Sequence, residues 1–99
     1  MELRQWKYFL KVAELRNFSE ASRQLNITQS TLSQQIKKLE GEMNVTLLLR
    51  DSHHVMLTDI GEAILPSVEK TIRDANACAD IIRDVQNLNT GTLNIGATK

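Results

Sequence analysis

Residues 28–40 concentrate amide, hydroxyl and ammonium side chains, with no carboxylate before Glu40. Leu32, Ile36 and Leu39 recur at steps of four and three, so on a helix they share one side and leave the polar residues on the other. Such groups suit hydrogen bonds to base edges and phosphates. The polar residues are Gln29, Ser30, Thr31, Ser33, Gln34, Gln35, Lys37 and Lys38. A solvated helix face that happens to lack acids is the alternative, which this stretch taken alone favours.

Catalytic or metal chemistry finds little support in the rest of the chain. The single Cys78 rules out an intramolecular disulfide and gives no metal-binding set, so it is expected to be a small apolar residue in a helix, with a redox sensor as the alternative. No nucleophile–base pair and no metal-ligand spacing is found, and 99 residues leave little chain to form a pocket. We therefore expect neither an enzyme nor a bound cofactor.

Composition is compatible with one small folded domain plus an extension. The net charge is zero, but residues 1–58 carry eight Lys and Arg against six acids (+2), and residues 59–99 carry four against six (−2). This asymmetry supports a nucleic-acid partner only weakly. Because no signal peptide and no apolar run near the roughly 20 residues of a membrane span is found, we expect a cytoplasmic protein without membrane association.

Two helices are predicted before the polar stretch. Residues 3–15 show the three-four spacing of an amphipathic helix, with Trp6 and Phe9 in its apolar stripe as core anchors. A short helix through Leu25 follows, for which Ser19 is the expected N-cap, with Phe18 at the position before it.

A tight turn separates the short helix from the polar one. Asn26 tolerates the left-handed conformation that such a turn needs, and Thr28 is a suitable N-cap for a helix over 28–42. Helix, short turn and helix match a helix-turn-helix, whose second helix enters the major groove with its N-terminal residues leading. An αα-hairpin of any three-helix bundle has the same periodicity and stays open as the alternative.

Two apolar runs, 47–50 and 55–58, flank a polar tetrapeptide and predict a β-hairpin. A hairpin directly after a recognition helix is a wing, here 50–57, whose tip can approach the DNA backbone or the minor groove. His53 and His54 would lie at that tip, where contact with DNA and plain surface exposure are equally compatible. A metal site is not expected, because adjacent histidines on a turn point apart.

A long helix is predicted next, capped by Thr58 and running to about residue 89. Its apolar residues repeat at steps of four and three, which is typical of a coiled-coil seam: Val68, Ile72, Ala75, Ala79 and Ile82. Since the helix cannot bury that seam alone, a second copy of the chain is the expected partner. Residues 92–99 alternate like a strand, and residues 90–99 are interpreted as the start of a further, truncated domain. The fold is thus expected to be mostly α: a winged helix-turn-helix of three helices and a β-hairpin over 1–58, then a dimerisation linker helix over 59–89.

The chain resembles the N-terminal region of LysR-type transcriptional regulators over nearly its whole length. The resemblance is carried by the ordered set Asn-Phe-Ser-Glu-Ala-Ser-Arg-Gln-Leu25, Thr-Gln-Ser-Thr-Leu-Ser-Gln-Gln-Ile-Lys-Lys-Leu-Glu40, Leu-Leu-Leu-Arg50, Leu-Thr-Asp-Ile-Gly61 and Gly-Thr-Leu-Asn-Ile-Gly96.

The resemblance implies sequence-specific binding of double-stranded DNA, at an interrupted inverted repeat, by a homodimer. It further implies a small-molecule effector that binds in a missing domain, and tetramers at full length. Carried over by position, Gln29, Ser33 and Gln34 are expected to contact bases. Thr28, Ser30, Thr31, Lys37, Lys38 and Arg50 are expected to contact phosphates.

Three departures from the family pattern are notable. Ser30 stands where the family commonly has Pro, and Gln34 stands where it commonly has Arg. Because Gln pairs best with adenine and Arg with guanine, the preferred DNA site should differ there. His53 and His54 replace the usual Arg or Lys, so wing contact should strengthen as the pH falls. A winged-helix module that binds protein instead of DNA is the rival hypothesis.

Overall fold

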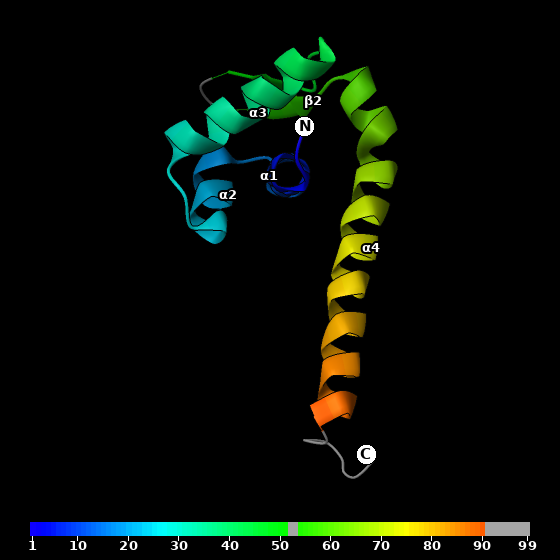
Figure 1. Ribbon diagram of the computed structural model, residues 1–99. Coiled ribbons are helices and arrows are strands. Elements are labelled where there is room, and N and C mark those ends of the chain that lie inside the picture. The colour runs from blue at the N-terminus through cyan, green and yellow to red at the C-terminus, as the bar shows by residue number, and fades with distance from the viewer. Residues whose placement is uncertain (52–53, 91–99) are drawn as a thin grey trace. The chain divides into compact units, whose positions relative to one another are not determined.

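The computed structural model describes residues 1–51 and 54–90 of the chain (Figure 1). The elements in chain order are α1 (Leu3–Leu15), α2 (Phe18–Leu25), α3 (Gln29–Met43), β1 (Leu48–Arg50), β2 (Val55–Leu57) and α4 (Asp59–Thr90). The chain divides into two compact units, Met1–Glu69 and Lys70–Lys99. The mostly α fold with a two-stranded wing and a long final helix is the one that the sequence predicts.

The core of the first unit lies between α1, α2 and α3, which all contact one another (Figure 1). Phe9 and Val12 of α1, Ala21 of α2, and Leu32 and Leu39 of α3 are completely buried. The apolar side chains predicted along the 28–40 stretch therefore face the core, because their four-three spacing keeps them on one side of the helix. This leaves the opposite side of α3 for other contacts.

One buried residue of α1 is polar and is not predicted by the spacing of the apolar residues. Gln5 is only 1% exposed, and its Oε1 accepts a hydrogen bond from the backbone N–H of Glu2 at 2.9 Å. Its Nε2 donates to Oε1 of Gln35 on α3 at 3.3 Å. The amide is buried without penalty because both of its ends are hydrogen-bonded, which joins α1 to α3.

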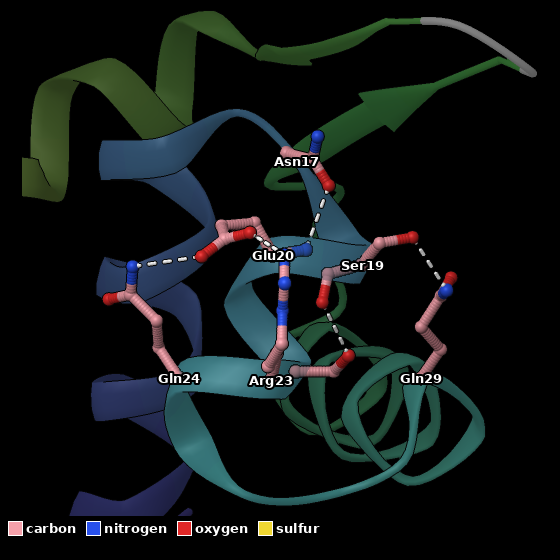
Figure 2. Close-up of polar contacts among 7 residues, drawn as sticks. Asn17, Ser19, Glu20, Arg23, Gln24 and Gln29 are labelled. Carbon is pink, nitrogen blue, oxygen red and sulfur yellow. Dashed lines mark hydrogen bonds and ion pairs between the residues drawn. The ribbon is translucent and has the colours of Figure 1, made fainter.

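The prediction of Ser19 as the cap of α2 is wrong. Arg16 ends α1 in the left-handed conformation (φ 53°), and Asn17 is extended, so its Oδ1 accepts from the N–H of Glu20 at 2.9 Å (Figure 2). Phe18 is consequently the first residue of α2 and not the residue before its cap. The turn at Asn26 (φ 62°) is confirmed.

The two strands form an antiparallel hairpin, slightly shorter than the sequence predicts. Leu48 pairs with Leu57, Leu49 with Met56, and Arg50 with Val55. The first of these pairs is buried, whereas Leu49 and Met56 are more than half exposed. This alternation follows from the period of two along a strand. It directs one face of the wing to the core and the other to solvent.

A carboxylate of α3 fixes the start of the wing. Oε2 of Glu40 accepts hydrogen bonds from the backbone N–H groups of Leu47 and Leu48, at 2.7 and 3.1 Å. Such charge-assisted bonds are among the stronger ones in proteins. The wing is thereby tied to the end of the helix that carries the polar stretch.

The start of α4 packs directly against the chain entering the wing. Thr58 Oγ1 accepts from the N–H of Gly61 at 3.0 Å, which confirms Thr58 as the cap of this helix. A Cβ on Gly61 would lie 2.4 Å from the carbonyl oxygen of Leu47. Only glycine fits this contact.

The helix α4 runs to Thr90, close to its predicted end. The strand expected over 92–99 lies outside the described residues. Among the helices of residues 1–51 and 54–90, none is long and apolar enough to cross a membrane.

Candidate nucleic-acid interface

Six of the residues expected to contact DNA surround one shallow hollow of about 430 Å³ on the outer side of α3. We call these residues the reading surface: Gln29, Ser30, Ser33, Gln34, Lys37 and Arg50. Five come from α3 and one from the end of β1. The structure thus brings together residues that the sequence separates by up to 21 positions.

Thr28 and Thr31 shape the first turn of α3. The Oγ1 of Thr28 accepts from the N–H of Thr31 at 3.1 Å and donates to the Oγ1 of Thr31 at 2.9 Å. The predicted cap is confirmed, and it satisfies one of the unpaired N–H groups that begin a helix. Both hydroxyls are exposed at the leading end of α3.

Gln29 is held by a residue of α2. Its Nε2 donates to the Oγ of Ser19 at 2.7 Å, and Figure 2 shows the two side chains pointing toward each other. Ser19 was predicted to cap a helix but instead positions the first side chain of the reading surface. The signal that could have found this role is Asn17, which is a better-placed cap and leaves the serine hydroxyl free for another partner.

Arg50 contacts both α3 and α2. Its Nη1 donates to the Oγ of Ser33 at 2.6 Å. Its guanidinium carbon lies 3.8 Å from the centre of the Phe18 ring, over the face of that ring. Phe18 is 7% exposed and is therefore fixed in the core. Arg50, expected only as a phosphate contact, is thus anchored to a base-contact candidate.

The other polar residues of the reading surface are open. Ser30, Gln34 and Lys37 are exposed, and no hydrogen bond to their side chains is found in the described part of the chain. Lys38 is also exposed and lies one turn before Glu42. The pKa of Glu42 is lowered, chiefly by its hydrogen bond with the Met1 ammonium group and further by the charges of that group and of Lys38. Because the side chains of Ser30, Gln34 and Lys37 have no such hydrogen bonds to the described residues, they can bind a ligand without first breaking one.

One histidine of the wing can be placed. The backbone N–H of His54 donates to Oδ1 of Asp51 at 2.7 Å, and its ring Nδ1 lies 3.5 Å from the same oxygen. The Asp51 carboxylate thus closes the hairpin and faces the imidazole. His53, the other expected wing contact, lies outside the described residues.

The residues predicted for the seam of α4 differ in exposure. Val68 and Ile72 are buried in the single chain, Ala75 is half-buried, and Ala79 and Ile82 are exposed. Further along the helix Ile81, Val85 and Leu88 are also exposed, at 60%, 48% and 54%. They form an apolar face beside the seam, and Ile82 lies where the two meet. This face is not among the sequence predictions, although Ile81, Val85 and Leu88 follow the same three-four spacing.

The other candidates for chemistry are the single cysteine and the residue types that can bind a metal ion. Cys78 is exposed on α4, and within residues 1–51 and 54–90 no group of three or more His, Cys, Asp or Glu is placed to hold a metal ion.

Comparison with known proteins identifies the family. The family described as bacterial regulatory helix-turn-helix protein, lysR family, matches residues 3–62. The chain is 40% identical over 98 residues to the HTH-type transcriptional regulator BudR of Klebsiella aerogenes, covering 99% of this chain and 68% of BudR. It is 36% identical over 95 residues to the probable HTH-type transcriptional regulator SinR of Salmonella typhimurium, covering 96% and 30%.

A solved structure agrees with this result. The BenM_DBD/catB site 1 DNA complex superposes with a TM-score of 0.82 at 32% identity, covering 87% of this chain and 97% of that one. The chain belongs to the LysR family of bacterial regulatory helix-turn-helix proteins. The resemblance stated from the sequence is confirmed, and the family is one of transcriptional regulators and not of enzymes. The chain spans about a third or less of the length of several relatives, among them SinR.

Proposed function

We propose that this chain binds double-stranded DNA sequence-specifically, as the DNA-binding part of a transcriptional regulator. The observation that carries the proposal is the reading surface, where amides and hydroxyls from the first half of α3 adjoin the cations Lys37 and Arg50 around one hollow. The likeness to BenM_DBD, solved as a DNA complex, supports it.

Helix α3 would be the recognition helix. The major groove is about 12 Å wide and admits an α-helix, whose leading side chains reach the base edges. Gln29, Ser33 and Gln34 are the proposed base contacts. The proposed phosphate contacts are Thr28, Ser30, Thr31, Lys37, Lys38 and Arg50, with His53 and His54 of the wing near the minor groove or the backbone.

A dimer would read an interrupted inverted repeat. A two-fold protein requires a two-fold site, with half-sites spaced by the distance between the two recognition helices. The seam of α4 and the exposed face of Ile81, Ile82, Val85 and Leu88 supply apolar area for a second copy. We further propose tetramers at full length, an effector that binds outside this chain, and a cytoplasmic location where the DNA is found.

The rival hypothesis, a winged helix that binds protein, agrees equally well with a net charge of zero. Selection from randomised duplexes at one fixed salt concentration separates the two. We expect enrichment of a motif with two related, inverted half-sites. Recovery of no preferred sequence, with the chain still folded by circular dichroism, would favour the protein-binding module.

A further inference from the structure

We infer that Arg50 is a positioning residue that sets the hydrogen-bonding direction of Ser33, and thereby the base that Ser33 selects. This inference rests on the proposed function and assigns the specificity of one part of its site. It starts from the two contacts of the Arg50 side chain, with Ser33 on α3 and with Phe18 on α2.

The guanidinium of Arg50 is anchored from two sides. The Phe18 ring covers one face of the guanidinium plane at 3.8 Å, and Phe18 cannot move aside because it is buried. Arg50 is also the last residue of β1 and is held in the hairpin by its pairing with Val55. A planar cation stacked on a fixed ring keeps its donors in a defined direction. One of these donors points at Ser33.

In the part of the chain that the structure describes, no ion pair joins Arg50 to a carboxylate. The nearest in sequence, Asp51, has its Oδ1 bonded to the backbone of His54. The Ser33 hydroxyl accepts its hydrogen bond of 2.6 Å from this cationic guanidinium. Charge-assisted hydrogen bonds of this kind are roughly twice as strong as neutral ones.

A hydroxyl normally serves as donor or acceptor, because its proton rotates to suit the partner. A cationic donor at the oxygen of Ser33 repels that proton and directs it away from Arg50, toward the hollow of the reading surface. Ser33 then presents a donor. The base atoms that accept in the major groove are N7 and O6 of guanine, N7 of adenine and O4 of thymine, whereas cytosine offers only the N4 donor.

The consequence is a preference for an acceptor at the base that Ser33 meets. Without Arg50 the Ser33 hydroxyl can either donate or accept a hydrogen bond, so the discrimination against cytosine at that position should fall. A phosphate contact behaves differently, because its loss weakens binding to all sequences and lowers the salt slope by about one unit.

A double-mutant cycle on the 99-residue chain tests the inference. Selection with the wild type and with Ser33→Ala first locates the base position that depends on Ser33. We expect Arg50→Met to reduce the preference against cytosine at that position by about fivefold, in the range of one hydrogen bond. In the Ser33→Ala background, Arg50→Met should change the preference there no further.

Lys37→Met is the matched control, since it removes one cation from the same hollow and no hydrogen bond joins Lys37 to Ser33 among the described residues. It should weaken binding and lower the salt slope with no change in base preference. An Arg50→Met protein that behaves like this control would overturn the inference and leave the proposed function standing. A wild type that enriches no sequence overturns the proposed function, and the inference with it.

Thermal melting followed by circular dichroism checks that each variant is folded. If Arg50→Met is unfolded at the assay temperature, Arg50→Lys takes its place in the cycle. Lysine keeps the charge but lacks the planar group that lies on Phe18 while reaching Ser33. Arg50→Lys should therefore keep the salt slope and lose the preference at the Ser33 position. Full retention of that preference contradicts the inference.

Discussion

Gln34 is exposed on the reading surface, with no hydrogen bond to its side chain from the described residues. A free amide can donate and accept at once, which matches the N6 and N7 atoms of adenine. We expect Gln34→Ala to lose discrimination at one base position at a cost of about 1–3 kcal/mol. Fluorescence anisotropy with duplexes varied at one position measures this cost.

The control for this prediction is Gln24→Ala. Gln24 is an exposed amide of α2 that donates to Glu20 at 3.3 Å and lies outside the reading surface. It should leave base preference unchanged. If Gln34→Ala weakens every duplex by the same factor, Gln34 contacts the backbone and not a base.

The sequence predicted which polar side chains share one face of α3, but not which of them are hydrogen-bonded to other parts of the chain. Periodicity assigned the polar face correctly, because Leu32, Ile36 and Leu39 are all buried. The bonds of Ser19 to Gln29 and of Arg50 to Ser33 join residues 10 and 17 positions apart. Such contacts depend on how the elements pack, which local pattern does not encode.

Among the elements, the start of α4 and the chain that enters the wing approach each other closely at Gly61. A methyl group added at Gly61 would meet the backbone carbonyl of Leu47, which cannot rotate away as a flexible side chain could. We expect Gly61→Ala to destabilise the chain by about 1–3 kcal/mol through overpacking. Urea denaturation measures this free energy of unfolding.

Gly41 supplies the opposite case within α3. A Cβ there would meet nothing within 4 Å, and the residue lies inside the helix. Gly41→Ala should therefore stabilise the chain by about 0.5–1 kcal/mol, because alanine loses less conformational freedom than glycine in a helix. A Gly61→Ala protein as stable as Gly41→Ala would show that the two chain segments separate without penalty.

The element bounds were largely predictable, and the errors have a physical cause. Caps at Thr28 and Thr58 and the turn at Asn26 combine a side chain and a position that few alternatives satisfy. At α2 both Asn17 and Ser19 are good caps, and the choice depends on where Arg16 ends the preceding helix. The burial of Gln5 was not predicted, because the spacing of apolar residues does not indicate where a hydrogen-bonded amide is buried.

For the molecule as a whole, the apolar face of α4 is the feature that most requires a partner. We expect Ile82→Asp to shift the chain from dimer to monomer in sedimentation, because it places a charge among apolar side chains. Ile82 is more informative than Ile72, since it is 57% exposed in the single chain and its replacement should not disturb folding. Arg73→Asp, at an exposed position on the opposite side of α4 from Ile82, is the control and should stay dimeric.

A dimer that persists in Ile82→Asp would move the interface to another surface. The sequence alone located a seam by spacing, but it could not tell which of those apolar residues the chain itself covers. Val68 is buried without any second copy. Exposure is a property of the folded chain, and it adds Ile81, Val85 and Leu88 to the candidates.

The leading end of α3 has a consequence for how this chain would find its site in a genome. From Thr28 to Ile36 it holds no charged residue. Non-specific attachment to DNA arises almost entirely from ion contacts with phosphates, and neutral hydroxyls and amides release no counterions when they bond a phosphate. In its proposed DNA-binding role, a protein with an uncharged leading end would spend less time bound to the millions of non-specific sites in a genome. Fewer copies per cell would then keep one operator occupied.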